Sequence, residues 1–449
     1  MIGVVGGGIA GLAATHRLQQ AGHEVQLFEA GSQLGGLAAT YETAGDPIER
    51  FYHHLSANET TIVELAAELG LEEAVEWHIG ENAYYVDGVE HPLDTIWQIA
   101  AYPYLSVYDK LRLGLLTKGI DVRGGIPRTD SYDDLTVYEG TPIEEFLREH
   151  TTAGVYEYFF EPLLDAKFGK RKNDISAAWL LGRIKFRSER DLLRGERLGY
   201  IDGGFGRLLD RLVAAVGAET ITANARVTGL EYGDRVERLT VEGPAGTTRH
   251  EVDTVVIATM PDLLETLTGY ESRVEFQGSV CAVVTMSEPL MDTYWLNIAE
   301  NSPFGALIEH TNFVSPERYG GQHLLYVASY VQGPEEELWG WSDEMVRDRW
   351  LSGIADLYPS FDRDAVEQMR IARNPQTAPV YSRGYLDRVI PYDLSEAVTE
   401  GLYYAGMASR AQYPERSLDG GVVAGQRCAE LIDERRSVQP RQKPRAGRP

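Results

Sequence analysis

Cysteine and long apolar runs are scarce in this 449-residue sequence. Its two cysteines, Cys281 and Cys428, stand far apart in apolar surroundings, so we expect two buried thiols in a reducing, cytoplasmic protein rather than a disulfide. No apolar run reaches the length of a membrane span, and the opening residues read as a strand and a helix rather than a signal peptide. Metal-ligand spacings of cysteine and histidine are lacking too, so no metal is predicted.

Positive charge is the next scarcity. The chain has 42 lysines and arginines against 68 aspartates and glutamates, which gives a formal net charge of -26. Such a protein repels phosphates, and nucleic acid is therefore excluded as a partner. The excess of carboxylates resembles the surface of proteins from salt-loving organisms, where high ionic strength screens the repulsion. The sequence thus predicts a halophilic protein.

What is present is the composition of a folded chain, 43% hydrophobic and 10% aromatic. At this length two intimately joined domains are expected rather than one core. The only basic stretch is the C-terminal end, rich in Arg, Pro and Gln, and we expect residues 436–449 to form a disordered tail.

The most specific pattern lies at the start of the chain, where "GVVGGGIAGL" occupies residues 3–12 between two short apolar strands. Strand, glycine turn, helix and strand make a βαβ unit that binds a dinucleotide. Gly6 permits the tight turn, Gly8 lets the backbone approach a pyrophosphate, and Gly11 lets helix and strand pack closely. The helix N-terminus then faces the phosphates.

Three features favour FAD over NAD as that dinucleotide. Glu29, placed to accept hydrogen bonds from a ribose diol, is followed by a second glycine pair, Gly35 and Gly36, which a longer ligand would use. The first unit is not continued by further βα repeats, as an NAD domain would be. Near the other end, "SLDGGVVAGQ" opens a helix with Gly420 and Gly421, and its N-terminus would stabilise negative charge on the reduced flavin ring.

Between the two glycine-rich ends of the chain, the sequence pattern changes from helical to strand-like. Residues 79–197 read as aromatic-rich and mostly helical, whereas residues 276–330 alternate like the strands of a second sheet. The fold class we predict is an α/β two-domain flavoprotein, with a Rossmann-like FAD-binding domain and an interleaved α+β substrate domain. The FAD-binding domain is predicted over residues 1–75, 200–270 and 396–435, and the substrate domain over 76–199 and 271–395.

Several stretches resemble the superfamily of flavin amine oxidases and protoporphyrinogen oxidases, which also includes phytoene desaturases and, more distantly, UDP-galactopyranose mutase. They are "VVGGGIAGLAATHRLQQAGHEVQLFEAGSQLGGLA", "EPLLDAKFG" with "SAAWLLGRI", "GYIDGGFGRLLDRL", "VDTVVIATMP" and "YYAGM…SLDGGVVAGQ". The resemblance spans most of the chain. It is greatest to oxidoreductases labelled protoporphyrinogen oxidase-like, which carry something similar to "ERFYHHL" and "IEHTNF".

The resemblance implies a set of cofactor contacts. The pyrophosphate would lie on the glycine turn and first helical turn, the adenosine ribose on Glu29, and the adenine against the Val227 backbone. The full set is Gly6, Gly8, Ile9, Ala10, Gly11, Glu29, Gly35, Gly36, Leu37, Val227, Gly406, Gly421 and Val422. The last three would flank the ribityl chain and the flavin ring.

This chain departs from its relatives at two places. Leu37 stands where many relatives have arginine, and Met407 where many have an acid, which removes an expected hydrogen bond to the ribityl chain. No cysteine lies in the loop before Gly420, so the FAD is expected to be bound non-covalently.

Hydride transfer to a flavin needs a dry slot beside the ring more than it needs a strong catalytic side chain. His53 and His54, in "IERFYHHLS", are candidates for orienting substrate or moving a proton, since imidazole titrates near neutrality. A hydrogen-bonded structural pair is the other interpretation, and the sequence slightly favours it. His310, in "LIEHTNF", either lines the substrate pocket or is a satisfied half-buried histidine.

Other side chains have two interpretations each. Arg50 and Arg383 either steady an anionic group or make surface pairs. Tyr294, Trp295 and Tyr381 either line an apolar pocket or pack in the core. The stretch "IWQIAAYPYLSVYDKLRLGLL" is expected to be a buried helix pair rather than a membrane-docking surface, because basic residues are so few.

The sequence therefore predicts an FAD-dependent oxidoreductase that takes a hydride from an apolar or amine-bearing small molecule and is reoxidised by oxygen, a quinone or another carrier. One alternative is a non-redox flavoenzyme of the UDP-galactopyranose mutase kind, for which Arg183, Arg187 and Arg373 are available to hold a diphosphate. A flavin-bound scaffold without turnover is the other.

Overall fold

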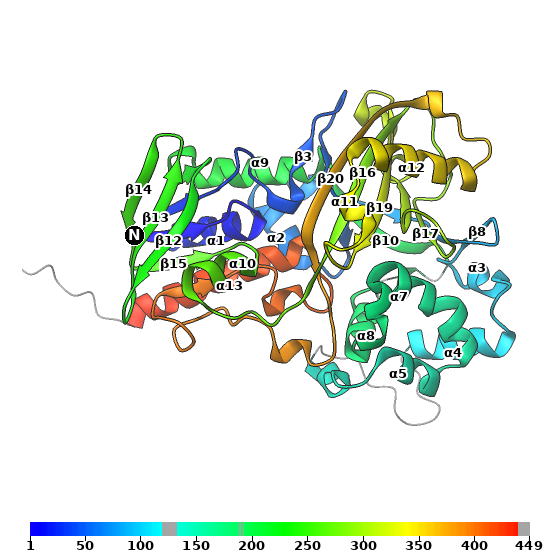
Figure 1. The fold of residues 1–449 in the computed structure, drawn as a ribbon, viewed down its shortest axis with the longest axis horizontal. Coiled ribbons are helices and arrows are strands. Elements are labelled where there is room, and N and C mark those ends of the chain that lie inside the picture. Colours follow the sequence, from blue (N-terminus) through cyan, green and yellow to red (C-terminus); the bar gives the residue numbers. More distant parts are fainter. Residues whose placement is uncertain (119–132, 188–189, 192, 439–449) are drawn as a thin grey trace, which may run out of the picture.

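The computed structural model describes residues 1–118, 133–187, 190–191 and 193–438 (Figure 1). All but the first three residues of the predicted tail, 436–449, lie outside the described residues, while residues 436–438 continue the last helix. Cys281 and Cys428 are free and buried, as predicted.

A five-stranded parallel sheet, in the order β11-β2-β1-β15-β21, forms the first layer. Its strands are β1 (Ile2–Val5), β2 (Val25–Phe28), β11 (Ile221–Thr222), β15 (Thr254–Ile257) and β21 (Leu402–Tyr404). Segments from both ends and the middle of the chain thus share one sheet. The predicted interleaved α/β fold is confirmed, including the strands at both ends of the chain.

Alternate side chains of β1 point to opposite faces of the sheet, and the two faces pack against different hydrophobic cores. Ile2 and Val4 pack on the side of α1 (Ile9–Gln20), α2 (Thr60–Glu68), α9 (Gly204–Val216) and α13 (Leu418–Val438). Val5 packs on the opposite side, against the antiparallel sheet of β12 (Arg226–Tyr232), β13 (Val236–Gly243) and β14 (Gly246–Glu251). Figure 1 shows the antiparallel sheet of β12, β13 and β14 at the left end of the molecule.

The second large layer is a seven-stranded sheet in the order β20-β16-β19-β18-β17-β7-β8. Its strands are β7 (Asn82–Val86), β8 (Val89–Pro92), β16 (Phe276–Met286), β17 (Trp295–Ile298), β18 (Ala306–Glu309), β19 (His323–Val331) and β20 (Val366–Pro379). Helices α11 (Glu337–Gly340) and α12 (Asp343–Leu357) follow β19, and Val346, Trp350 and Ile354 of α12 pack on this sheet's core. The sheet predicted over residues 276–330 is confirmed.

The prediction that residues 79–197 are mostly helical is wrong for their first part. Residues 82–92 form the hairpin β7–β8, which joins the seven-stranded sheet through β17. Asp87 and Gly88 both have positive φ at the turn, 51° and 76°. An Asp-Gly pair between apolar runs is a hairpin signal, and it outweighs the aromatic content that suggested helix.

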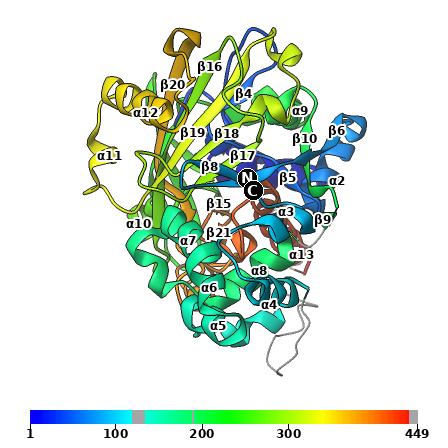
Figure 2. The ribbon, with the colours of Figure 1, turned by 90° about the vertical axis from the view of Figure 1, so that its right-hand side faces the viewer.

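The helical unit follows and lies beside the sheet, with α4 to α8 gathered below it in Figure 2. It comprises α3 (Ile96–Ala101), α4 (Val107–Thr117), α5 (Ile143–His150), α6 (Ala153–Val155), a π-helical turn (Tyr156–Phe160), α7 (Glu161–Phe168) and α8 (Ala177–Phe186). Elsewhere, α10 (Pro261–Thr268) follows β15. None of the helices within the described residues combines the length and the hydrophobicity that crossing a bilayer requires.

The prediction that residues 96–116 form a buried helix pair is wrong for α3 and for one face of α4. Trp97 is 70% exposed and Val107 is 86% exposed, and no residue of α3 is buried. Only one side of α4, which includes Leu113 and Leu116, reaches the core. The apolar residues are spread around both helices rather than along a single stripe, so packing covers only some of them.

Short strands join the two large layers. The sheet β5 (Leu55–Ser56), β10 (Gly195–Ile201) and β6 (Val75–Gly80) carries β9 (Arg190–Asp191) at one side, and β3 (Thr40–Tyr41) pairs with β4 (Ile48–Glu49).

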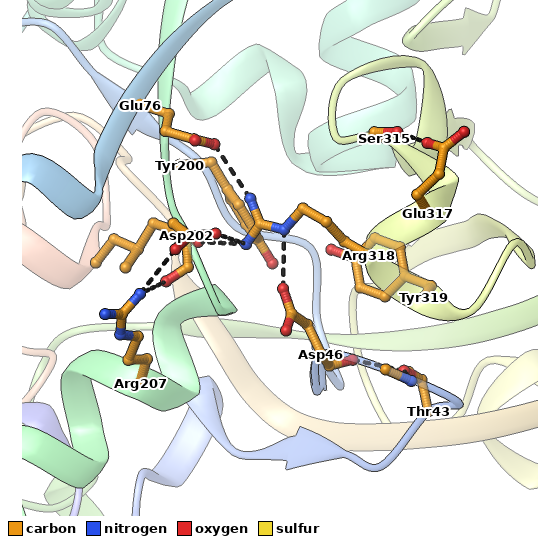
Figure 3. A network of polar contacts seen from close by, with 12 residues as sticks. Thr43, Asp46, Glu76, Tyr200, Asp202, Arg207, Ser315, Glu317, Arg318 and Tyr319 are labelled. Carbon is orange, nitrogen blue, oxygen red and sulfur yellow. Dashed lines mark hydrogen bonds and ion pairs between the residues drawn. The ribbon is translucent and has the colours of Figure 1, made fainter.

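Arg318 binds three of these segments at once (Figure 3). Its guanidinium lies 2.8 Å from Asp46, 3.1 Å from Glu76 and 3.3 Å from Asp202, and it also donates to the Ile201 carbonyl at 3.2 Å. The side chain is only 18% exposed. Arg318, which precedes β19, is therefore linked by ion pairs to the loop before β4, to β6 and to the residue that follows β10.

We expect Arg318→Met to lower the free energy of unfolding by about 2 kcal/mol, because three neighbouring carboxylates lose their shared cation. The control is Arg207→Met in the same network, since Arg207 is 40% exposed and its carboxylate partner is Asp202 alone. A surface pair of that kind contributes less than about 1 kcal/mol. Urea unfolding of the three proteins gives the comparison, and equal losses for the two variants would contradict this role of Arg318.

Candidate functional site

The carboxyl ends of the parallel strands define one edge of the first sheet, the edge at which such sheets bind ligands. β1 runs into Gly6, β2 into Glu29, and β21 toward Gly406. The loops after these strands are close, because a Cβ placed on Gly406 would be 2.0 Å from the Thr259 carbonyl oxygen that follows β15. Three of the predicted cofactor residues thus share this edge.

The first glycine turn is held tightly closed. Gly6 has a φ of +109°, and a Cβ on Gly11 would be 1.9 Å from the Gly6 carbonyl oxygen. Gly8 differs from both, because a Cβ there meets nothing within 4 Å. Gly8 is the N-cap of α1 and no side chain caps the helix. Open space therefore lies over an N-terminus whose N–H groups favour an anion.

The glycines of the two chain ends do converge. A Cβ on Gly421, in the first turn of α13, would be 2.7 Å from Ile9 Cγ2, and one on Gly425 would be 2.2 Å from the Ala10 carbonyl oxygen. α13 therefore begins against the first turn of α1, the arrangement that one ligand spanning both N-termini requires. Val422, beside Gly421, is fully buried.

Glu29 directly follows β2 at this edge of the sheet. Its carboxylate accepts hydrogen bonds from the backbone N–H groups of Gly7 and Gly31, both at 2.6 Å. Ala225, just before β12, donates to the Glu29 carbonyl at 2.8 Å, which brings Val227 to the same end of the site. This is the end predicted for adenosine.

The second glycine pair lies against the first. Gly35 donates to the Gly7 carbonyl at 2.8 Å and forms an isolated bridge with Gly8, and a Cβ on Gly36 would be 3.3 Å from Gly8 Cα. Leu37 follows in a short 3-10 turn, Gly36–Ala38, and packs on the core.

His53 and His54 are both half-buried. His53 Nδ1 lies 2.6 Å from the Phe51 carbonyl oxygen, which can only accept, so the proton is on Nδ1 and Nε2 is left as an acceptor. Burial, and next Arg416, lower the pKa of His53 to about 3. His54 Nδ1 lies 3.1 Å from the Tyr294 hydroxyl, and burial lowers its pKa to about 4. Such imidazoles are weak bases and suit an orienting role.

His310 occupies a separate aromatic cluster. Its Nε2 lies 2.7 Å from the Tyr319 hydroxyl, and its ring is 5.1 Å from that of Tyr200. Phe205 lies between this cluster and His53, 5.3 Å from Tyr200 and 6.2 Å from His53. Burial lowers the pKa of His310 to about 3. The structure therefore gives His310 a satisfied core position.

Of the remaining residues proposed from the sequence, some lie near His54 and others do not. Tyr294 and Trp295 lie beside His54, with ring centroids 6.2 and 5.9 Å away. The others do not lie with them: Arg50 hydrogen-bonds Gln33, Arg383 pairs with Asp174, Arg373 pairs with Asp343, and Tyr381 donates to the Gln412 carbonyl.

A largely half-buried group of charges near His54 was not predicted. Glu415, in the loop before α13, binds Lys167 of α7 at 2.9 Å and also Arg183 of α8. Arg187 lies 3.4 Å from Glu196. Burial raises the pKa of Glu415, but Arg183 and Lys167 outweigh it and bring it to about 2. A signal existed for Lys167 and Arg183, which stand in the matched stretches "EPLLDAKFG" and "SAAWLLGRI", whereas Glu415 lies just outside the matched stretches.

Glu49 is a second buried carboxylate near the site. It is 0% exposed, and it accepts hydrogen bonds from the Tyr200 hydroxyl at 2.7 Å and from the Phe205 N–H at 2.8 Å, at the start of α9. Burial raises its pKa from 4.5 to about 7. The sequence gives no sign that Glu49 is buried, because a Glu-Arg pair is typical of an exposed segment.

The raised pKa of Glu49 makes a prediction about stability. Between pH 4.5 and about 7 the unfolded chain releases the Glu49 proton before the folded one does, so this contribution is complete below pH 4.5 and is lost as pH rises. Relative to Glu49→Gln, the wild type should lose about 3 kcal/mol of unfolding free energy across that range. Urea unfolding at several pH values measures this, with the exposed Glu72→Gln as control, and parallel curves for wild type and Glu49→Gln would contradict it.

These residues fit a dinucleotide: two helix N-termini meet, open space lies over Gly8, and Glu29 stands at one end. Fold and site together define a two-layer α/β protein with a βαβ unit of the dinucleotide-binding class. The model of the family "Flavin containing amine oxidoreductase" matches residues 9–433, and the chain belongs to that family. It is accordingly a flavin-dependent oxidoreductase.

Individual relatives agree with this placement. A 15-cis-phytoene desaturase of Narcissus pseudonarcissus is 24% identical over 471 residues, which cover 96% of this chain and 78% of the desaturase. The structure resembles that of a protein designated a protoporphyrinogen oxidase from Exiguobacterium sp. 255-15, with a TM-score of 0.76, 18% identity and coverage of 97% and 98%. Reduced UDP-galactopyranose mutase matches with a TM-score of 0.70, 16% identity and coverage of 96% and 95%. The predicted superfamily is thereby confirmed.

Proposed function

We propose that this enzyme holds FAD non-covalently and oxidises an apolar or amine-bearing small molecule by removing a hydride from carbon. The observation that carries the proposal is the meeting of α1 and α13 at Ile9 and Gly421, beside the open space at Gly8. When bound, the flavin would supply the hydride acceptor. Gly8 and the first turn of α1 would bind its pyrophosphate, Glu29 its ribose, and the first turn of α13 the negative charge of its reduced ring.

The chain's own side chains bind and orient the substrate. His53 Nε2 accepts a hydrogen bond, because Nδ1 carries the proton. With a pKa near 3, His53 does not take up a proton at neutral pH, so a substrate amine must arrive already deprotonated or be oxidised without a side-chain base. Tyr294 and Trp295 exclude water beside His54.

The alternative, a non-redox reaction on a sugar nucleotide, has one point in its favour. Arg183 and Arg187 both lie in the charged group near His54, although each already has a carboxylate partner there. Arg373 does not join them, since it pairs with Asp343 near the surface.

Anaerobic photoreduction followed by rapid mixing tests the proposal. We expect the reduced flavin to be reoxidised by oxygen or by a quinone, and to remain unchanged on mixing with UDP-galactose. A flavin–sugar adduct would favour the mutase reaction instead. A reduced flavin that no acceptor reoxidises would contradict the proposal and leave a scaffold without turnover.

A further inference from the structure

The N-terminus of α13 has backbone donors of two kinds. Gly420 donates its N–H to Ser417 Oγ at 3.0 Å, and Gly421 donates to the Ser417 carbonyl at 3.3 Å, so both are already bonded. Among the described residues, the N–H groups of Leu418 and Asp419 have no acceptor. Such groups carry the partial positive charge of a helix N-terminus. These two N–H groups are therefore the ones that α13 can offer to the negative charge of a reduced flavin.

The side chain of Asp419 serves a different helix, α2. Its Oδ1 accepts the N–H of Ile62, the third residue of α2, at 2.7 Å. The N-cap residue of α2 is Glu59, whose own side chain makes no capping hydrogen bond. An oxygen that accepts from the third residue of a helix satisfies one of its four free N–H groups. Asp419 thus caps α2 from 357 residues further along the chain.

Packing surrounds this hydrogen bond on both helices. Ile62 of α2 and Val422 of α13 are fully buried in the same hydrophobic core, and Asp419 itself is half-buried. A Cβ on Gly421 would be 2.7 Å from Ile9 Cγ2, so α13 also begins against α1. The first turn of α13 is therefore held by α1 through close packing and by α2 through the Asp419 carboxylate.

The start of α2 is joined closely to the segment of His53 and His54. β5 follows His54 directly and pairs with β10. Ser56 of β5 donates its N–H to Glu59 Oε2 at 2.6 Å, and Glu59 donates its N–H to the Ser56 carbonyl at 3.0 Å. These reciprocal hydrogen bonds join β5 to α2. The hydrogen bond at Ile62 therefore connects the two histidines with the N-terminus of α13.

We infer that Asp419 is a positioning residue, which holds the N-terminus of α13 beside the segment of His53 and His54. The inference rests on the proposed function, because the N–H groups of Leu418 and Asp419 act only on a bound flavin. The Asp419 carboxylate acts through α2, whose N-terminal N–H groups offset part of its negative charge. It can therefore position the positive end of α13 without cancelling the effect of that end.

The affinities for oxidised and reduced FAD test this in four proteins: the wild type, Asp419→Ala, Asp419→Asn and the control Asp433→Ala. Asparagine keeps an oxygen that can accept from Ile62, whereas alanine does not. Asp433 also joins α13 to another segment, since it lies 3.0 Å from His23 Nε2, but it stands near the C-terminal end of the helix. Flavin fluorescence gives the affinity for oxidised FAD, and the midpoint potential of the bound flavin gives the ratio of the two affinities.

We expect Asp419→Ala to weaken the binding of reduced FAD about 10-fold more than that of oxidised FAD, which lowers the potential by about 30 mV. Asp419→Asn and Asp433→Ala should not lower it. The direction separates the two possible roles, because loss of a negative charge alone would raise the potential in both Asp419 variants. If Asp419→Ala does not fold, Asp419→Glu takes its place: it keeps the charge but lengthens the side chain, so only a positioning role predicts a lower potential.

The inference is overturned if Asp419→Ala raises the potential or leaves it unchanged, or if Asp419→Asn lowers it as much as Asp419→Ala does. Equal weakening of both forms of FAD in Asp419→Ala leaves the potential unchanged and would show a merely structural role. A wild type that binds no FAD would refute the proposed function and the inference with it. If the wild type binds FAD and the potentials of all four proteins agree, the inference alone fails.

Discussion

Gly8→Val should yield a folded protein that has lost its flavin. The backbone at Gly8 is extended, with φ -73° and ψ 174°, which valine adopts readily, and no atom lies within 4 Å of the new Cβ. The new Cβ therefore meets no protein atom, and the side chain takes up space over the α1 N-terminus. We expect affinity for FAD to fall about 100-fold or more, equivalent to about 3 kcal/mol.

Flavin fluorescence during reconstitution measures that affinity, and circular dichroism shows whether the variant folds. Gly114→Val is the matched control, because Gly114 also has open space around its Cβ position but lies on the exposed side of α4. If Gly8→Val binds FAD as well as the control does, the phosphates do not lie on this turn.

The second large effect is expected at Glu415. Glu415→Gln leaves Lys167 and Arg183 without their shared carboxylate in a buried position, and we expect a loss of about 3–5 kcal/mol of unfolding free energy at pH 7. The pKa near 2 adds a pH signature: the wild-type contribution is present above pH 4.5 and is lost as pH falls toward 2.

A double variant separates charge from packing. Adding Lys167→Met to Glu415→Gln removes one of the stranded cations, so part of the lost stability should return. Glu430→Gln, whose partner Arg427 is an exposed neighbour on α13, should change little. Urea unfolding of the four proteins gives the comparison. A double variant no more stable than Glu415→Gln would show that the loss does not come from unpaired buried charge.

The parts of the fold that sequence predicts are those with strong local rules. The first βαβ unit could be predicted because Gly6, Gly11 and the apolar strands each fit only one local conformation. The strands over residues 276–330 follow from their alternating pattern. The hairpin at Asp87–Gly88 also follows a local rule. The prediction missed it because the aromatic residues around it were interpreted as helical.

The candidate site divides in the same way. The cofactor half of the site can be predicted from its glycines. If one ligand binds to both ends of the chain, Gly421 must lie close to Ile9, as it does. The charged group beside His54 is made by tertiary contact. Lys167 and Glu415 form an ion pair although they lie 248 residues apart in the sequence, so no local pattern links them. Burial also makes weak bases of His53 and His54, which residue type alone does not reveal.

One measurement tests the central claim most directly: the visible spectrum of the purified protein, followed by denaturation and identification of whatever is released. The account predicts a yellow protein that frees one FAD per chain and leaves a colourless polypeptide. A protein that is colourless, and stays so after incubation with excess FAD, would contradict it, and so would colour that remains on the denatured chain.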